Sequence, residues 1–589
     1  MFSVAARGGG RGVSRVSRKP PPPRPFVIPP WAYAIALVAV TACAYLNTFE
    51  SPLVLDDITT ILANPSIRRL SRLGDVLFPS GEIYSAGRPV LNLSFALNYA
   101  VGGTAVAGYH LVNLAIHLGA TLLLFGLARR VMEFRAPAGT ADPRAAPVAC
   151  AIAALWALHP LHTSSVTYVS QRAECLMGLF YLFTLYALVR GARTANRTWA
   201  VVGTISCALG MATKETMATA PVVAFLFDAV FLSDSWRDAW RQRRAWHLAH
   251  AATWLVLVGL AVGSKLGQRA VGFGHGLDSL SYLALESQAI CLYVWRSFVP
   301  IHLVFDYGPD LPAPDRWAVA GAALGLAGAL AASAWALRRR AAGGFFGVAF
   351  FLLLAPTSSI IPIAGQPIAE NRMYLPLVAI VAGVVGIVVT RWRRPTTWWA
   401  LATVALLLAG ATYARNETFR STLTLWGDTA AKRPLNERAA TLWSEELKRA
   451  GRLPEAIAAL EAIHQRRPRS AEICNNLAAA LFQAGRLPRA IETLREAIRL
   501  KPGYAEAHAN LGVMFYQSGA FAEALERFAS ALQLGNINAT NHNFAGLCLA
   551  RLGRLAEAQP HFERAVQLDP SRADARTNLD WIREQRRTP

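Results

Sequence analysis

The sequence predicts an all-α protein in two parts, a polytopic bundle of membrane helices followed by a superhelix of short helical repeats. Hydrophobic residues make up 53% of the 589-residue chain and charged residues only 16%, whereas a soluble domain usually carries about 25% charged residues. Apolar segments long enough to cross a bilayer recur as far as residue 414. Beyond that residue, glycines recur every 34 residues between segments of mixed charge.

The composition also excludes several classes of protein. Intrinsic disorder is excluded, because it requires low hydrophobicity and this chain is 53% hydrophobic. Seven cysteines without a CxxC pair make neither a disulfide framework nor a zinc site, so we expect no metal ligands. The formal charge of +22 arises from 59 Lys and Arg against 37 Asp and Glu. Its arginines cluster beside apolar segments, which is typical of the positive-inside bias of membrane proteins, and no nucleic-acid-binding motif is present.

The N-terminal segment, residues 1–30, is basic, lacks acidic residues and contains a proline run at 20–23. We expect a solvated cytosolic tail. An organelle transit peptide is the alternative, although the apolar segment that follows has no cleavage pattern.

A membrane domain is predicted over residues 31–414. Its eleven apolar segments are 31–49, 110–130, 147–163, 174–191, 198–213, 216–233, 247–264, 316–337, 344–363, 373–391 and 396–414. Arginine clusters follow every second segment, beginning at Arg129, Arg190, Arg237, Arg338 and Arg391. Because such clusters favour the cytosol, eleven crossings place the N-terminus inside and the long loop 50–109 and the C-terminus outside. The apolar stretch 282–300 would reverse that order if it crossed, so we expect it to be re-entrant or interfacial.

A connector over 415–440 is followed by four repeats over 441–570 and a cap or tail over 571–589. Gly485, Gly519 and Gly553 set the 34-residue period, and Ala490, Ala524 and Ala558 recur in phase. A degenerate earlier copy carries Trp443, Gly451, Ala456 and Pro468. This pattern is typical of the tetratricopeptide repeat, in which small residues let two antiparallel helices pack closely. Such repeats stack into a superhelix with a concave binding face.

Polar residues with potential chemistry fall in the predicted outside loops. Asp56 and Asp57 follow the first span, and adjacent carboxylates at a membrane surface are costly unless they are hydrated or used. The alternative is that Asp57 caps a short helix over the residues that follow it. Arg88 and His110 lie further along the same loop.

Further candidates stand at the mouths of later spans. His159 and His162 have a spacing that could suit a metal, but the intervening proline and the lack of a third ligand favour capping and hydrogen bonding. The ionisable candidates are Arg172, Glu174, Lys214, Glu215, Glu370 and Arg372, with Tyr374 beside the last of them. Ionisable residues beside a span suggest function by default, although structural ion pairs and snorkelling are alternatives. Arginine suits phosphate, which it can grip with two hydrogen bonds.

Together these residues place carboxylates beside several cations on one face of the membrane. That arrangement suits attack by a hydroxyl acceptor on a sugar whose leaving group is a lipid-anchored phosphate.

The order of motifs resembles the transmembrane and tetratricopeptide repeat-containing O-mannosyltransferase-like proteins, in their bacterial form. The motifs that carry the resemblance span roughly residues 31–570 and are Leu55-Asp56-Asp57, Gly87-Arg88-Pro89, Gly108-Tyr109-His110, His159-Pro160-Leu161-His162, Arg172-Ala173-Glu174, Lys214-Glu215 and Glu370-Asn371-Arg372-Met373-Tyr374. The resemblance implies a C-type glycosyltransferase fold, a polyprenyl-phosphate sugar donor and inversion at the anomeric carbon. It further implies that Asp56 or Asp57 is the catalytic base, with Arg372, Arg172, Lys214 and Arg88 as candidates for holding the donor phosphate.

We therefore expect a glycosyltransferase of the inner or plasma membrane, with its repeats on the extracytoplasmic side recruiting a protein or other hydroxyl acceptor. No cofactor is expected with certainty, and the need for a divalent metal stays open. His110, His159, His162, Glu174, Glu215, Glu370 and Tyr374 are supporting candidates. The alternative is a non-enzymatic membrane-anchored scaffold, although a pure anchor needs one span. A transporter, the third hypothesis, would favour ionisable residues near the middle of the bilayer.

Overall fold

The computed structural model describes residues 28–79, 83–134, 142–263, 279–308, 315–358 and 366–585, which form helices and contain no strand. The predicted cytosolic tail lies almost entirely outside these residues. The helices of the bundle are α1 Pro30–Ala44, α2 Leu73–Leu77, α3 Pro89–Gly102, α4 Val106–Phe134, α5 Ala145–Ala157, α6 Thr163–Val166, α7 Arg172–Thr194, α8 Thr198–Met211, α9 Ala220–Phe227, α10 Trp236–Ala252, α11 Trp254–Gly263, α12 Ser279–Phe298, α13 Arg316–Arg338, α14 Ala342–Leu354, α15 Pro376–Arg391 and α16 Pro395–Glu417. The predicted all-α fold is confirmed.

Each of the predicted apolar segments overlaps an apolar helix. Among the described residues, six continuous helical segments are long and apolar enough to cross a membrane, namely Val106–Phe134, Val169–Thr194, Glu215–Leu232, Trp236–Val262, Arg316–Arg338 and Pro395–Glu417. A seventh consists of Ala145–Ala157 and Pro160–Val166, bent by 51°. The remaining four predicted segments correspond to the shorter helices α1, α8, α14 and α15. The chain is a membrane protein, and its number of crossings stays a prediction. The stretch 282–300 lies mostly in α12, which is not among these apolar segments.

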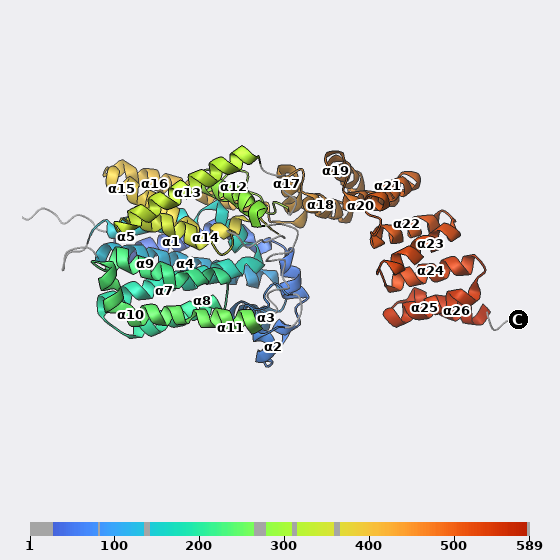
Figure 1. Ribbon diagram of the computed structural model, residues 1–589, viewed down its shortest axis with the longest axis horizontal. Coiled ribbons are helices and arrows are strands. Elements are labelled where there is room, and N and C mark those ends of the chain that lie inside the picture. The colour runs from blue at the N-terminus through green and yellow to red at the C-terminus, as the bar shows by residue number, and fades with distance from the viewer. Residues whose placement is uncertain are drawn as a thin grey trace, which may run out of the picture.

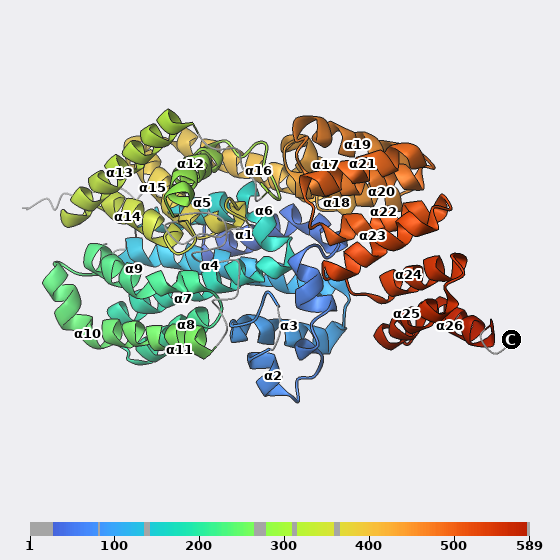
Figure 2. The ribbon, with the colours of Figure 1, turned by 45° about the vertical axis from the view of Figure 1, so that its right-hand side comes forward.

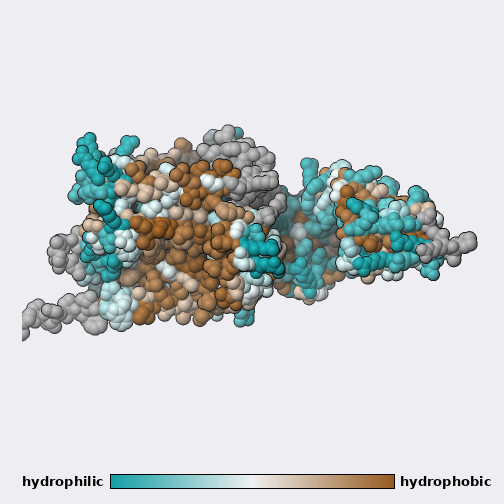
Figure 3. All heavy atoms as spheres, turned by 90° about the horizontal axis from the view of Figure 1, so that it is seen from below, coloured by the Kyte–Doolittle hydropathy of each residue, from teal (hydrophilic) through white to brown (hydrophobic). Residues whose placement is uncertain are grey.

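The helices of the bundle pack side by side along one common direction (Figure 1), and a broad apolar surface separates two hydrophilic ends (Figure 3). The core is built from aromatic and aliphatic side chains of helices distant in sequence, among them Trp156, Tyr181, Phe345 and Leu377. The loop after α1 and the short helices α2 and α3 lie at the end of the bundle that faces the repeats (Figures 1 and 2).

The C-terminal third is a stack of antiparallel helix pairs. These helices are α17 Thr422–Lys432, α18 Glu437–Arg449, α19 Leu453–Arg466, α20 Ala471–Gln483, α21 Leu487–Leu500, α22 Ala505–Gln517, α23 Phe521–Gln533, α24 Ala539–Arg551, α25 Leu555–Leu568 and α26 Ala573–Gln585. Gly451, Gly485, Gly519 and Gly553 each adopt φ between 73° and 80° in the turn of a helix pair, a conformation that only glycine adopts without strain. The in-phase alanines Ala490, Ala524 and Ala558 are fully buried, as the close packing of the pairs requires.

A hydrophobic cluster joins the repeats to the bundle. Phe419, Leu425, Trp426 and Ala439, from the start of the C-terminal third, pack with Val54, Tyr168 and Phe305 from the end of the bundle. Arg438 of α18 forms an ion pair with buried Asp306 at 3.0 Å. Helix α17 and the start of α18 therefore lie in the region expected to be a connector, and both helices lie on the side of the bundle that carries Asp56.

Candidate active site

The backbone turns sharply just before the two carboxylates of the first loop. Leu55 has φ of +45°, in the left-handed region that is sparsely populated by residues other than glycine and costs about 1–3 kcal/mol. Val54 on one side of this turn is buried in the cluster that joins bundle and repeats. The turn gives Asp56 and Asp57 different surroundings, although they are adjacent in sequence.

Asp57 is fully buried, and its carboxylate accepts hydrogen bonds from Val54 and Ser170. Its Oδ1 accepts from the backbone N–H of Ser170 at 2.6 Å and from the Ser170 hydroxyl at 2.5 Å, and Oδ2 accepts from the backbone N–H of Val54 at 3.0 Å. Burial raises the pKa of Asp57 to about 7. The alternative of a helix cap is wrong, because the side chain makes no capping hydrogen bond to the helix at 58–62. Asp57 instead ties the first loop to the start of α7.

Asp56 is only partly buried. The Tyr168 hydroxyl accepts a hydrogen bond from the backbone N–H of Asp56 at 3.1 Å and donates to its carboxylate. Burial raises the pKa of Asp56, while this hydrogen bond and the positive charges of Arg88 and Arg438 oppose the rise. Of the two predicted bases, Asp56 is the one that is only partly buried and lies near the cations Arg88 and Arg438.

Arg88 and Glu215 form a bidentate ion pair between the first loop and the turn after α8. Nη2 of Arg88 lies 3.1 and 3.0 Å from the two carboxylate oxygens, and its guanidinium lies 4.9 Å from the centroid of the Tyr84 ring. The Glu215 charge raises the pKa of Arg88 against the effect of burial, so this arginine is permanently cationic. Its Nη1 is buried and makes no hydrogen bond to the described residues.

A pocket of about 230 Å³ opens beside this ion pair. Gly87, Arg88, Lys214 and Glu215 provide its polar lining, and its apolar lining consists of Met211, Leu257, Leu260 and Ala261. Three of these apolar residues belong to α11, a helix whose surface is largely exposed. The accessible surface of the pocket is thus almost entirely apolar, and Arg88 and Lys214 are the cations among its lining residues.

Lys214 connects this pocket to the start of α7. Its Nζ pairs with Glu174, and both side chains are less than a tenth exposed. Asn371 donates to Gln171 at 2.7 Å and lies 3.4 Å from the same Glu174 oxygen. The predicted residues Lys214 and Glu174 are therefore brought together, and both adjoin the segment that precedes Arg372.

Arg172 is fully buried and lies away from the pocket lining. Its guanidinium donates to Asn113 at 2.6 Å, to Asn98 at 2.8 Å and to the backbone oxygens of Ser94 and Tyr109 at 3.1 Å. These contacts cross-link α3, α4 and α7. They favour a structural role, and the predicted contact of Arg172 with a donor phosphate stays a prediction.

Arg372 is engaged in a similar way. It forms an ion pair with Glu286 of α12 at 2.9 Å and donates to the backbone oxygens of Gln366 and Pro367. Its neighbour Glu370 accepts from the backbone N–H of Val304 at 2.8 Å and from Tyr307 at 2.9 Å, and burial raises the pKa of Glu370. This pair fixes α12 and the segment after it to the start of α15.

The predicted histidines contact backbone carbonyl oxygens and aromatic rings. His110 lies 2.9 Å from the Ser51 carbonyl oxygen, and His159 lies 3.2 Å from that of Ser297. The ring of His162 packs 4.9 Å from those of Trp156 and Tyr374. Among the described residues, no group of three potential metal ligands includes any of these side chains.

Sequence reasoning missed several residues of the site. Tyr168, Glu286 and Asp306 stand in apolar or mixed segments, and Arg438 lies within the predicted connector. His117, inside an apolar helix, hydrogen-bonds Tyr374 at 2.9 Å. A polar residue within an apolar run is the one signal that points to His117 and Glu286.

Comparisons with known proteins confirm the repeats and the family resemblance. Residues 478–519 match the model of the TPR repeat, and residues 539–572 match that of the tetratricopeptide repeat. The chain is 35% identical over 203 residues to Protein O-mannosyl-transferase Tmtc1 of Drosophila melanogaster, covering 33% of this chain and 22% of that protein. It is 24% identical over 433 residues to Protein O-mannosyl-transferase F38B6.6 of Caenorhabditis elegans, covering 69% and 58%. The matched part thus spans about a fifth to three fifths of these relatives' length.

Solved structures resemble a part of the chain. A crystal structure of MamA protein is 22% identical, with a TM-score of 0.23, covering 26% of this chain and 82% of that one. The thermophilic TPR protein TTC0263 of Thermus thermophilus is 22% identical, with a TM-score of 0.25, covering 30% and 94%.

Proposed function

We propose that this chain is a membrane glycosyltransferase that transfers a sugar from a polyprenyl-phosphate donor to a protein Ser/Thr or other hydroxyl acceptor. The observation that carries the proposal is partly buried Asp56, whose carboxylate is held by Tyr168 and influenced by the charge of Arg88, a residue that lines the pocket. The O-mannosyl-transferase names of the relatives support the reaction class and suggest mannose as the sugar.

The pocket suits the donor because two cations, Arg88 and Lys214, stand among the residues that line its largely apolar surface. A phosphate would lie against Arg88 and Lys214, whose charges are paired in the free protein with Glu215 and Glu174. The polyprenyl chain would lie along Met211, Leu257 and Leu260 and continue over the apolar surface of the bundle. Arginine beside a phosphate forms short, charge-assisted hydrogen bonds. We therefore assign the donor phosphate to Arg88 and Lys214, ahead of Arg172 and Arg372.

Asp56 supplies the base in the transfer step. The acceptor oxygen attacks the anomeric carbon, the bond from that carbon to the phosphate oxygen breaks, and the polyprenyl phosphate leaves with its electron pair. The acceptor proton passes to the Asp56 carboxylate as the glycosidic bond forms. Attack on the face opposite the leaving group inverts the anomeric configuration. Cations at the leaving phosphate stabilise the charge that develops there.

The surroundings of Asp56 match this role. Burial raises its pKa and makes the carboxylate a stronger base, while Tyr168, Arg88 and Arg438 oppose that rise. Arg438 comes from α18, so the repeats contribute to the electrostatics of the base. A repeat array that recruits the acceptor protein would present its hydroxyl on this same side.

A transfer assay tests the proposal. Purified full-length protein is incubated with a panel of polyprenyl-phosphate sugars and acceptor peptides, and wild type is compared with Asp56→Asn. We expect product with one donor class and a loss of turnover of about 10²- to 10⁴-fold in the variant. Absence of transfer from every donor, or full activity of a folded Asp56→Asn protein, would contradict the proposal and favour the scaffold.

The donor site has its own test. Arg88→Gln should raise the KM for the donor, because it removes the charge that faces the phosphate. Arg72→Gln is the matched control, since Arg72 lies in the same loop, is 64% exposed and pairs loosely with Asp75. Equal donor KM values for the two variants would exclude Arg88 from the donor site.

A further inference from the structure

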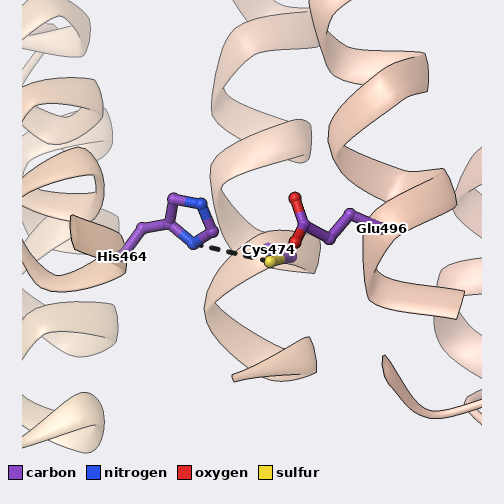
Figure 4. A group of neighbouring side chains, drawn as sticks. All are labelled: His464, Cys474 and Glu496. Carbon is purple, nitrogen blue, oxygen red and sulfur yellow. Dashed lines mark hydrogen bonds between the residues drawn. The ribbon is translucent and has the colours of Figure 1, made fainter. Parts of the chain in front are cut away.

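Three side chains of different chemistry converge between the first two repeats. His464 belongs to α19, Cys474 to α20 and Glu496 to α21, and one ligand atom from each lies within 4.8 Å of the others. Figure 4 shows the imidazole and the carboxylate approaching the Cys474 sulfur from the two flanking helices. Cys474 is fully buried, whereas His464 and Glu496 are half-buried, so the group is accessible from one side.

We propose that His464, Cys474 and Glu496 bind a Zn²⁺ ion. Sγ of Cys474 lies 3.6 Å from Nδ1 of His464. A tetrahedral zinc with bonds of about 2.3 Å to sulfur and about 2.0 Å to nitrogen would hold these two atoms about 3.6 Å apart. The sulfur and the imidazole are thus already spaced for a common metal ion, and the Glu496 carboxylate can close on the ion by rotation of its side chain.

The ligand types favour zinc over the hard cations. Thiolate and imidazole select zinc and related transition metals, whereas Mg²⁺ and Ca²⁺ take oxygen ligands. Cys474 binds as a thiolate, and its proton passes to the solvent. Three protein ligands leave a fourth position for water or for a side chain of a partner.

The neighbouring charges allow this arrangement. Glu496 pairs with Arg499 at 3.2 Å, and the arginine side chain is 72% exposed. An exposed pair of this kind contributes little to stability, so the carboxylate can leave Arg499 for the metal at small cost. Sequence spacing could not predict the site, because its ligands come from three separate helices.

Zinc at this point would cross-link the array where it begins. His464 lies in the degenerate first repeat, and Cys474 and Glu496 lie in the second repeat. Because each repeat contacts chiefly its neighbours, a metal bridge would fix the angle between the first repeat and the rest of the array. The proposal is independent of the glycosyltransferase activity.

The test uses full-length protein in detergent, stripped of metal with a chelator and titrated with Co²⁺ and Zn²⁺. We expect one equivalent of Co²⁺ to bind, with the near-ultraviolet absorption of a cobalt–thiolate bond, and Zn²⁺ to abolish that absorption. Cys474→Ser should lose the absorption. His464→Gln and Glu496→Gln should keep a weaker band and bind at least about tenfold more weakly.

Cys548→Ser is the matched control. Cys548 is a fully buried thiol of α24, and among the described residues it belongs to no group of three potential ligands. Its variant should bind Co²⁺ like wild type. If Cys474→Ser misfolds, Glu496→Gln still tests the proposal, because Glu496 is only half-buried and its change should preserve the packing of the array. Absence of the cobalt–thiolate band in wild type would overturn the proposal, as would an unchanged band and affinity in the Cys474 and Glu496 variants. The contact between Cys474 and His464 would then be only a sulfur–imidazole hydrogen bond.

Discussion

Asp56 and Asp57 are chemically identical residues with different surroundings. The left-handed turn at Leu55 directs Asp57 into a buried set of three hydrogen-bond donors and leaves Asp56 partly open beside Tyr168. Asp57 is fully buried and accepts hydrogen bonds from three protein donors, so its carboxylate is not exposed to a substrate. Asp56 is only partly buried and lies near cations, which suits a general base.

The first prediction separates the two carboxylates by stability. In Asp57→Asn, either orientation of the amide places its NH2 group against a backbone N–H, that of Val54 or that of Ser170. One buried donor then lacks an acceptor, which costs about 1–3 kcal/mol. Asp56→Asn should lose turnover without that loss. Thermal unfolding of both variants in the same detergent is the measurement, and an Asp57→Asn protein as stable as wild type would contradict the assignment.

The second prediction concerns pH. The base acts only when ionised, so activity falls as pH drops through the pKa of Asp56. The Tyr168 hydroxyl lowers that pKa by hydrogen bonding to the carboxylate. In Tyr168→Phe the pKa therefore rises, and the acid limb of the kcat/KM profile should shift to higher pH. Tyr307→Phe is the control, because its hydroxyl donates to Glu370. An acid limb unmoved by Tyr168→Phe would exclude Asp56 as the titrating base.

At the scale of helices, α7 positions the site. The segment before it contributes Tyr168 and Ser170, and its first turn carries Arg172 and Glu174. One turn further along, Gly178 faces Tyr374, whose hydroxyl is fixed to His117 at 2.9 Å and whose carbonyl oxygen accepts from Trp156 at 2.8 Å. A small residue in α7 thus allows the segment after Arg372 to approach it closely.

The third prediction tests that approach. A Cβ at Gly178 would lie 2.5 Å from the Tyr374 ring, and the ring is held by its hydrogen bond. Gly178→Ala should therefore lower the free energy of unfolding by about 1–3 kcal/mol. Gly386→Ala in α15 meets no atom within 4 Å and should be neutral or stabilising by about 0.5–1 kcal/mol. Equal unfolding temperatures of the two variants would refute this account of the α7 packing.

At the scale of the whole molecule, the bundle and the repeats share a hydrophobic joint. Trp426, Phe419 and Phe305 pack with Tyr168, and Arg438 reaches Asp306. A truncation at residue 440 would cut α18 and open this joint, so the repeats nearest the membrane belong structurally to the site. A removal that spares the site has to begin further along the array.

The fourth prediction concerns topology. The loop that carries Asp56 and the helices α17 and α18 pack together, and the arginine clusters favour the cytosol at the other end. A phosphatase that is active only outside the cytosol should be active when fused after Arg420. Activity confined to a cytosolic reporter at the same position would reverse the orientation of the whole bundle, because the joint keeps the Asp56 loop and α17 on one side.

The fifth prediction concerns acceptor recruitment. Deletion of residues 505–589 removes α22–α26 and leaves α17–α21 with the joint intact. Because repeats stack chiefly on their neighbours, the bundle should fold, and transfer to a short peptide should continue near the wild-type rate. Transfer to the full protein acceptor should fall. An unchanged rate on the protein acceptor would remove the recruiting role from these repeats.

The sequence by itself determined the features that depend on local pattern. Apolar runs identified the helices of the bundle, because a helix that crosses a membrane needs a continuous apolar stretch long enough to span the bilayer. The period of glycines and alanines identified the repeats, because each pair of helices packs only where small residues recur. The ordered motifs identified Asp56, Asp57, Arg88 and Lys214 as candidates, and the comparisons confirmed the family resemblance.

Only the tertiary structure distinguished among those candidates. Asp57 meets Ser170 across 113 residues, Arg88 meets Glu215 across 127 and Arg372 meets Glu286 across 86. No local pattern encodes which carboxylate is fully buried or which arginine lines a pocket, because both depend on residues supplied by distant helices. The group of His464, Cys474 and Glu496 could not be predicted from the sequence either, because its three side chains meet only when neighbouring repeats stack.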